Sequence, residues 1–226
     1  MFRICYRGER TLVKEYKMVV YDCDGVIFNS EKANFEYYKY LFKKFNLPEI
    51  NINDKKSMNI LHTYSNDKVI EHFTKTKKEM NEIIAFSRTA DYSQFYKFMQ
   101  MEEGFAETCK RLKKRGIKIG VATNRSHTFE GIVKYFKLYE LIDDYVTVLD
   151  VEFPKPEPDM LLFLTEKNGF STKDIVFIGD SILDYRAAES AEIDFIGYKF
   201  CYNKCCYINS HVEIFNYLCN TKLNLK

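Results

Sequence analysis

The chain has 226 residues, of which 46% are hydrophobic and 29% are charged, and its formal net charge at pH 7 is +2. This composition is that of a soluble globular protein with one domain, or one domain and a small insert, and the small charge gives no reason to expect a nucleic-acid or membrane partner. No apolar run approaches the roughly 20 residues that span a bilayer, and residues 1–17 lack the apolar core of a signal peptide. We therefore expect a cytoplasmic protein.

The seven cysteines are an odd number and show no small-domain framework, so we interpret them as reduced thiols. Cys201, Cys205 and Cys206 cluster near the end of the chain, and Cys219 follows them. Their spacing matches no zinc pattern, which favours small apolar or surface side chains over a soft metal site.

In chain order, residues 1–17 form an N-terminal extension that is either an extra edge strand or a poorly ordered tail. The stretch MVVYD at 18–22 is apolar up to Asp22, which is typical of a strand buried on both faces of a parallel sheet. From 31 to 100 no convincing strand follows, and aromatic and aliphatic residues recur at helical spacing, interrupted at Pro48. We predict a small helical cap domain at 31–100, inserted after strand one.

Beyond residue 100, short apolar runs alternate with helical patterns. The predicted strands lie at 117–123, 145–150, 174–180 and 194–198, and the predicted helices at 102–115, 127–136, 157–168 and 182–191. This alternation predicts an α/β fold, a parallel sheet with helices on both faces. Residues 18–30 and 101–226 are assigned to this core domain.

Polar residues follow the ends of these strands, at the edge where open parallel sheets bind ligands. They are Asp22 and Asp24 after the first strand, Thr123 and Asn124 after the second, Asp180 and Asp184 after the strand at 174–180, and Lys155 in the loop FPKPEPD. Although these residues are far apart in the sequence, the predicted fold brings them to one edge of the sheet.

Side chains at i and i+2 of extended backbone point the same way, so Asp22 and Asp24 are expected to face one substrate. With Asp180 nearby, several carboxylates cannot all stay ionised unless a hard cation binds between them, and Mg²⁺ fits oxygen ligands best. An ionised Asp22 can act as a nucleophile, and Asp24 can transfer a proton.

A phosphoryl group accounts for the remaining residues, because catalysis on it consists mostly of positioning and charge neutralisation. Lys155 supplies a positive charge, and the Thr123 hydroxyl and the backbone N–H groups near Cys23, Asp24 and Asn124 supply donors. A sharp turn after the two aspartates needs Gly25, which carries no Cβ.

Four stretches resemble, in this order and spacing, the four motifs of the haloacid dehalogenase superfamily, and most of all its phosphoglycolate-phosphatase-like branch with a helical cap. They are DCDGV (22–26), VATNRS (121–126), FPKPEPD (153–159) and IGDSILDYRAAESA (178–191). The resemblance covers residues 18 to about 198 and implies a Rossmann-like parallel sheet as the core.

The resemblance also implies a role for each matching residue. Asp22 is the expected nucleophile that forms an aspartyl-phosphate, and Asp24 is the expected general acid/base. Phosphate is expected to be bound by Thr123, Asn124 and Lys155. The expected Mg²⁺ ligands are Asp22, Asp180 and the backbone carbonyl of Asp24, with Asp184 supporting them. Members that remove halide from carbon lack an aspartate at the position of Asp24, so a dehalogenase is not expected.

Two features are expected to be local. Asn29 and Ser30 stand at the cap hinge, where they can cap the first cap helix. Glu192 stands where the family has a glycine after its fourth motif, and a left-handed conformation there costs about 1 kcal/mol.

Histidines and cap cations give weaker signals. The four histidines share no metal-ligand spacing and are interpreted as surface or packed side chains; they are His62, His72, His127 and His211. Of these, His62 and His127 fall near the expected site. The cap cations Lys55, Lys56 and Arg88 are interpreted as solvated.

The expected function is that of a Mg²⁺-dependent phosphatase acting on a small phosphate ester through an aspartyl-phosphate. The alternatives are a phosphosugar mutase of the same superfamily and a non-catalytic binding or regulatory protein on the same fold.

Overall fold

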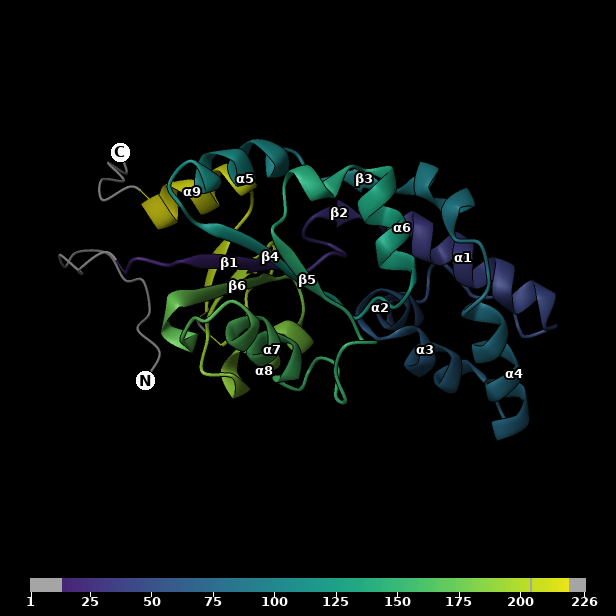
Figure 1. Cartoon of the computed structure of the whole chain (residues 1–226). Coiled ribbons are helices and arrows are strands. Elements are labelled where there is room, and N and C mark those ends of the chain that lie inside the picture. Colours follow the sequence, from purple (N-terminus) through teal and green to yellow (C-terminus); the bar gives the residue numbers. More distant parts are fainter. Residues whose placement is uncertain (1–13, 204, 220–226) are drawn as a thin grey trace.

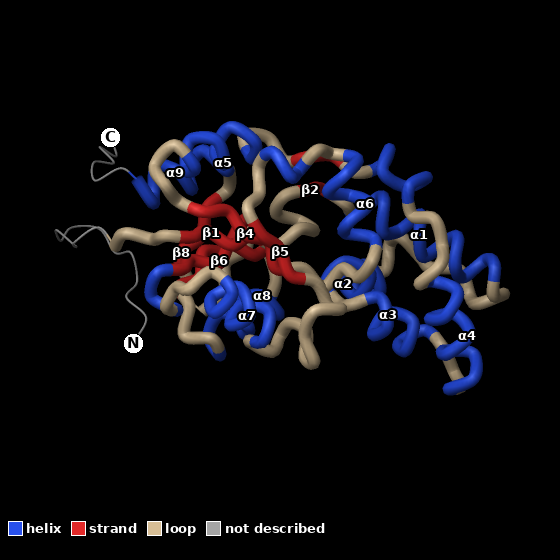
Figure 2. Tube along the Cα trace, viewed as in Figure 1, coloured by secondary structure: helices blue, strands red, loops and turns tan. Residues whose placement is uncertain are grey.

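A computed structural model describes residues 14–203 and 205–219, so most of the predicted N-terminal extension lies outside the described residues. Its centre is a sheet of parallel strands in the order β5-β4-β1-β6-β7-β8 (Figures 1 and 2). The strands are β1 (Met18–Tyr21), β4 (Lys118–Ala122), β5 (Asp144–Val146), β6 (Ile175–Gly179), β7 (Asp194–Tyr198) and β8 (Cys206–Ile208). The predicted Rossmann-like parallel sheet is confirmed, with the first strand in its middle.

Helices cover both faces of the sheet, as the sequence predicts (Figure 1). On one face lie α5 (Phe105–Lys113) and α9 (His211–Cys219), on the other α7 (Asp159–Lys167) and α8 (Ile182–Ser190), and α6 (Thr128–Tyr135) follows β4. Strand residues alternate between the two layers. Val19 belongs to the hydrophobic cluster that contains Phe105 and Phe215, whereas Val20 belongs to the cluster that contains Leu164. Burial on both faces explains why these strands are continuously apolar.

A helical segment separates β1 from the rest of the sheet. It contains α1 (Glu31–Lys44), α2 (Lys55–Thr63), α3 (Asn66–Phe73), α4 (Lys77–Ser87) and a 3₁₀ helix, η1 (Ser93–Phe98). In Figure 1 these helices lie on the right, beside the sheet rather than on its faces. The helical insertion after strand one is thus present, while its division as a domain at 31–100 stays a prediction.

Two short strands that the sequence does not predict join the insertion to the core. β2 (Phe28–Asn29) pairs antiparallel with β3 (Gln100–Met101), so the chain leaves and re-enters the core side by side. Neither strand is long enough for a periodic pattern to reveal it.

The strand predicted at 145–150 is wrong in its extent, because β5 spans only 144–146. The Thr147 N–H and hydroxyl both donate to the Asp150 carboxylate, at 2.8 and 2.7 Å. This local side-chain turn takes the backbone out of the sheet.

The C-terminal segment, which resembles the family only loosely, forms β8 and α9. His211, the first residue of α9, is fully buried, and its Nε2–H donates to the Val26 carbonyl at 2.8 Å. Thr108 of α5 in turn donates to the His211 carbonyl at 3.0 Å. The segment therefore packs behind the loop that follows β1. Among the described residues no disulfide is found.

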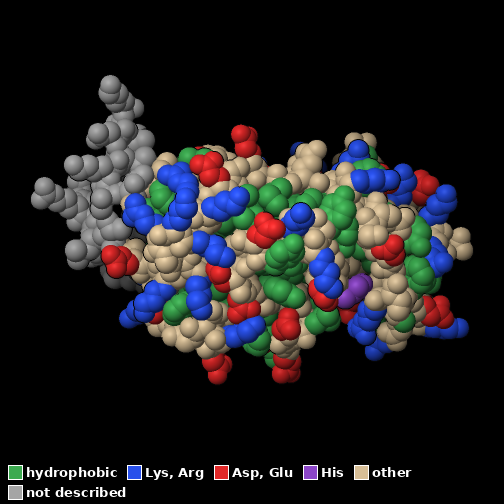
Figure 3. Space-filling model, turned by 45° about the horizontal axis from the view of Figure 1, so that its top comes forward, with side chains coloured by type: hydrophobic (Ala, Val, Ile, Leu, Met, Phe, Trp, Pro, Cys, Tyr) green, Lys and Arg blue, Asp and Glu red, His purple; other side chains and the backbone are tan. Residues whose placement is uncertain are grey.

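No helix within the described ranges is long and apolar enough to cross a membrane. On the face shown in Figure 3, basic and acidic side chains are interspersed, with hydrophobic side chains between them. A mixed distribution of this kind is typical of a solvated surface.

Candidate active site

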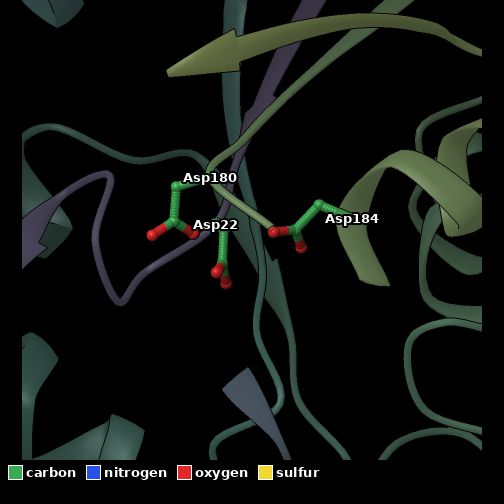
Figure 4. Close-up of side chains that lie close together, drawn as sticks. All are labelled: Asp22, Asp180 and Asp184. Atoms are coloured by element: carbon green, nitrogen blue, oxygen red, sulfur yellow. The ribbon is translucent and has the colours of Figure 1, made fainter. Parts of the chain in front are cut away.

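Three carboxylates meet where the central strands end. Asp22 follows β1, Asp180 follows the neighbouring strand β6, and Asp184 reaches in from the first turn of α8 (Figure 4). One oxygen of each lies within 4.8 Å of the others. The pairing of β1 with β6 brings these residues together across more than 150 positions of sequence, as the strand-end rule predicts.

Lys155 lies between two of these carboxylates. Its Nζ is 2.8 Å from Asp22 Oδ1 and 2.7 Å from Asp184 Oδ1, and the residue is only 4% exposed. Burial disfavours the charge, but Asp184 and Asp22 outweigh it and raise the pKa of Lys155 above its ordinary value. The amine therefore stays protonated and is a fixed positive charge beside Asp22.

The acidic side chains are crowded enough to hinder one another's ionisation. Burial, with added repulsion from Asp184 and Asp24, raises the pKa of Asp22 to about 7 despite the attraction of Lys155. Burial, followed by repulsion from Asp184 and Asp22, raises the pKa of Asp180 well above its ordinary value. A single lysine does not neutralise this group, which leaves an unbalanced cluster of oxygen donors.

The cluster fits a hard divalent cation. No hydrogen bond or ion pair to the Asp180 carboxylate is found among the described residues, whereas both oxygens of Asp184 accept hydrogen bonds, Oδ1 from Lys155 and Oδ2 from the Ser181 N–H and hydroxyl. Asp184 and Ser181 form the capping box of α8. Asp22 and Asp180 are thus the residues with carboxylate oxygens to offer a metal, and Asp184 is suited to support them.

Asp24 is held by a residue that sequence reasoning missed. Arg125, in the motif VATNRS after β4, donates from Nε to Asp24 Oδ2 at 2.7 Å and from Nη2 to Oδ1 at 2.6 Å. Burial opposes the ionisation of Asp24, but Arg125 and the hydroxyl of Ser30 hold the pKa of Asp24 below its ordinary value. The motif placed Arg125 next to the site, but no local pattern reveals that its side chain turns inward.

The predicted capping role of Ser30 is wrong in part. Ser30 is the N-cap residue of α1, but its side chain caps no helix N–H. It donates instead to Asp24 Oδ1. This charge-assisted hydrogen bond uses the hydroxyl hydrogen of Ser30, whereas a cap would use its oxygen as an acceptor for a helix N–H.

The predicted phosphate-binding residues Thr123, Asn124 and Lys155 line one cavity together with Asp22 and Asp180. Thr123 is 1% exposed, and its Oγ1 accepts from the Arg125 N–H at 3.2 Å, which leaves its hydroxyl hydrogen to donate. The Asn124 side-chain NH₂ donates to the Lys155 carbonyl at 3.1 Å, so this side chain steadies the lysine loop. Within the described residues, the backbone N–H groups of Cys23, Asp24 and Asn124 have no hydrogen-bond acceptor. These donors remain for an anion.

A cavity of about 680 Å³ lies over the cluster, between the sheet edge and the helical insertion. Core residues such as Asp22, Thr123 and Lys155 line its floor, and insertion residues such as Tyr37 and Tyr64 line its walls. Its other lining residues include His62, His127 and Lys55, but not Lys56 or Arg88. Of the cations and histidines noted in the sequence, these three therefore face the site.

The parallel sheet ends in an acidic cluster with a buried lysine, and a helical insertion covers this cluster. These features define an α/β enzyme with its site at the carboxyl edge of the strands. The chain belongs to the haloacid dehalogenase-like hydrolase family, which matches residues 19–198. The resemblance noted in the sequence is confirmed, and the protein is a phosphatase-type hydrolase of this family.

Two relatives with curated names are phosphatases. Pyrophosphatase PpaX of Bacillus cereus (strain AH820) is 26% identical over 175 residues, which cover 76% of this chain and 78% of that protein. Phosphoglycolate phosphatase of Escherichia coli (strain K12) is 32% identical over 105 residues, which cover 43% of this chain and 39% of that protein.

Solved structures agree on the fold. A haloacid dehalogenase superfamily hydrolase from Geobacter sulfurreducens PCA has a TM-score of 0.71 and 34% identity, covering 90% of this chain and 96% of that chain. A putative phosphoglycolate phosphatase from Lactobacillus plantarum has a TM-score of 0.77 and 17% identity, covering 90% and 99%.

Proposed function

We propose that the protein is a Mg²⁺-dependent phosphatase that hydrolyses a small phosphorylated metabolite through an aspartyl-phosphate on Asp22. The observation that carries this proposal is the placement of Asp22, whose Oδ1 lies 2.8 Å from Lys155 Nζ and which has an oxygen within 4.8 Å of an oxygen of Asp180. This arrangement puts a nucleophile, a fixed positive charge and a free metal-binding oxygen within a few ångströms of one another.

In the first half-reaction, a carboxylate oxygen of Asp22 attacks phosphorus and the bond from phosphorus to the ester oxygen breaks. The leaving oxygen takes both electrons of that bond and a proton from Asp24, which Asp24 must bind before this step because Arg125 and Ser30 favour its ionised form in the substrate-free protein. The products are the free alcohol and the aspartyl-phosphate. Lys155 stabilises the negative charge that spreads over the phosphoryl oxygens.

In the second half-reaction, water attacks phosphorus, its proton passes to Asp24, and the bond from phosphorus to Asp22 breaks. Phosphate leaves, and both aspartates return to their starting states. The two carboxylates therefore have different tasks and different surroundings: Asp22 lies against Lys155 and the acidic cluster, whereas Asp24 lies against Arg125, which favours its ionised form in the substrate-free protein.

The metal ligands in this proposal are Asp22, Asp180 and the backbone carbonyl of Asp24. A divalent cation bound there supplies positive charge that keeps Asp22 ionised and neutralises the phosphoryl oxygens. Asp184 holds Lys155 rather than the metal, since both of its oxygens already accept hydrogen bonds. Mg²⁺ is the cation that best suits a small set of carboxylate and carbonyl oxygens with several retained waters.

The phosphate itself is bound by the Thr123 hydroxyl, by Lys155 and by the free N–H groups of Cys23, Asp24 and Asn124. Asn124 contributes through its backbone, because its side-chain NH₂ is directed at the Lys155 carbonyl. A cavity of about 680 Å³ accommodates a metabolite-sized leaving group next to this phosphate site.

The test is release of phosphate from a panel of phosphorylated metabolites by the purified full-length chain with Mg²⁺. Pyrophosphate and phosphoglycolate head the panel, because they are the substrates that the names of the relatives indicate. We expect EDTA to abolish turnover and added Mg²⁺ to restore it. Asp22→Asn should be inactive but folded, since Lys155 keeps its contact with Asp184.

Two results would contradict the proposal. Turnover that is unchanged in EDTA would show that no metal is needed. An active Asp22→Asn variant would show that the reaction does not pass through a covalent intermediate on Asp22. Interconversion of phosphosugar isomers without net phosphate release would assign the protein to the mutases instead.

A further inference from the structure

Arg125 is a core residue whose guanidinium reaches Asp24 with two parallel hydrogen bonds. The distances are 2.7 Å from Nε to Oδ2 and 2.6 Å from Nη2 to Oδ1, and the Arg125 side chain is only 8% exposed. A paired fork of this kind fixes the plane of a carboxylate as well as its position. A lysine at the same place offers only a point charge.

The same guanidinium contacts the helical insertion. Its Nη2 donates to Asn34 Oδ1 at 2.8 Å and lies 3.3 Å from the Tyr92 hydroxyl, which itself donates to Asn34 Oδ1 at 3.1 Å. The Tyr92 ring lies 5.1 Å from the guanidinium carbon. Asn34 is in α1, near the start of the insertion, and Tyr92 directly precedes η1, near its end. Arg125 thus links Asp24 to both ends of the insertion.

The two oxygens of Asp24 are unequally occupied. Oδ1 accepts from the Ser30 hydroxyl, from Arg125 Nη2 and, at 3.4 Å, from Asn34 Nδ2. Among the described residues, only Arg125 Nε donates to Oδ2. A carboxylate oxygen has two lone-pair directions, so Oδ1 is saturated while Oδ2 keeps one acceptor site.

We propose that Arg125 is a positioning residue for the reaction. It fixes the Asp24 carboxylate so that Oδ2 is the oxygen that exchanges a proton with the leaving group and with water, and it does so while Asn34 and Tyr92 of the insertion are docked. This inference rests on the proposed function, in which Asp24 is the acid/base. Docking of the insertion and orientation of Asp24 are then one event, because the same guanidinium nitrogen serves both.

The experiment compares two esters that need the leaving-group proton to different extents. 4-Nitrophenyl phosphate has a leaving group that departs as a stable anion, whereas the alkyl phosphate that the wild type hydrolyses fastest has one that must be protonated. The quantity measured is kcat/KM, which reports the steps up to departure of the leaving group.

Arg125→Lys keeps the charge and removes the fork. We expect its kcat/KM to fall about 100-fold for the alkyl ester, the usual size of a general-acid contribution, and at least tenfold less for the aryl ester. Equal losses for both esters would overturn the proposal, since a merely structural role affects both alike.

The insertion side is tested with a matched pair of tyrosines. Tyr92→Phe removes the hydroxyl between Arg125 and Asn34 and keeps the ring. Its kcat/KM should therefore fall more for the alkyl ester than for the aryl ester. Tyr96→Phe removes a hydroxyl from a neighbouring ring of the same aromatic group and should leave kcat/KM unchanged for both esters. A Tyr92→Phe variant indistinguishable from Tyr96→Phe would contradict the link to the insertion.

A second readout needs no turnover. In the substrate-free protein, Arg125→Lys should speed amide hydrogen exchange in α1 and η1, which the guanidinium helps to hold, while α7 and α8 exchange as in the wild type. Unchanged exchange in α1 would refute the docking contact. A wild-type protein that hydrolyses neither ester would refute the proposed function, and the exchange experiment would still decide whether Arg125 holds the insertion.

Discussion

Gly25 lies so close to Asp180 that a Cβ atom at position 25 would be 1.8 Å from Asp180 Oδ2. The residue also has a φ of +77°, in the left-handed region that favours glycine. The sequence indicated only the turn as the reason for a glycine here. The structure adds a second reason, because the Asp180 carboxylate occupies the space that a side chain at position 25 would fill.

Gly25→Ala should therefore displace Asp180 and abolish metal-dependent activity. Gly116→Ala is the matched control, because Gly116 has a φ of +76° but no atom within 4 Å of the place that a Cβ would take. Both variants carry a conformational cost of about 1 kcal/mol, and only Gly25→Ala has the clash. Urea unfolding and Mg²⁺ titration check this, and equal behaviour of the two variants would contradict it.

Asp180→Asn should stabilise the metal-free protein. Because the pKa of Asp180 is raised in the folded state, its ionisation destabilises the fold, and this destabilisation is present above the unfolded-state pKa of about 3.8. Removing the charge relieves the cost of burying it and the repulsion from Asp184 and Asp22. The free energy of unfolding in EDTA at neutral pH should be higher than that of the wild type.

The same variant should lose its response to metal. Mg²⁺ at 100 times its dissociation constant should stabilise the wild type by about 2.7 kcal/mol, and Asp180→Asn by much less. Thermal unfolding with and without Mg²⁺ measures both effects. A variant that is less stable than the wild type in EDTA would show that Asp180 supports the fold rather than straining it.

The approach of Asp22, Lys155 and Asp180 to one another could be predicted from the sequence because each follows an apolar strand or stands in a loop at the same sheet edge. That inference needs only the parallel order of the strands. Their chemical roles stay predictions.

The inward turn of Arg125 and the hydrogen bond from Ser30 to Asp24 could not be predicted in this way. Both depend on the direction of a side chain across two separate parts of the fold, and neither leaves a periodic trace in the sequence. That His211 is a packed rather than a surface histidine could not be decided from the sequence for a similar reason, because its burial is set by the packing of α9 against α5.

His211 should make stability depend on pH. Burial, the largest cause, lowers its pKa to about 4, from 6.5 in the unfolded chain, since its Nδ1 is buried without a partner. The folded state then binds fewer protons, so the stabilisation is fully present above pH 6.5 and is lost as pH falls toward 4. By pH 5 the loss amounts to about 2 kcal/mol.

His211→Gln removes the titration and keeps an N–H donor for the Val26 carbonyl. Between pH 7 and pH 5, its free energy of unfolding should therefore fall by about 2 kcal/mol less than that of the wild type. Chemical denaturation at the two pH values measures the difference. Parallel losses in the two proteins would show that His211 titrates normally in the folded state.

Glu192 occupies a position that favours glycine. Its φ is 55°, and the end of α8 has the hydrogen bonds of a Schellman motif, from the Glu192 N–H to the Glu189 carbonyl at 3.2 Å and from the Ile193 N–H to the Ala188 carbonyl at 2.9 Å. The left-handed conformation considered from the sequence is therefore present. Glu192→Gly should raise the free energy of unfolding by about 0.5–1 kcal/mol, because glycine adopts this conformation without strain.

Arg186→Gly, on the exposed side of the same helix, is the control. It should lower the free energy of unfolding by about 1 kcal/mol, because glycine is unfavourable inside a helix. Activity should be the same in both variants and the wild type, because neither residue lines the cavity. Urea unfolding of the three proteins measures the differences. A loss of stability in Glu192→Gly would mean that the glutamate side chain contributes more than its backbone strain costs.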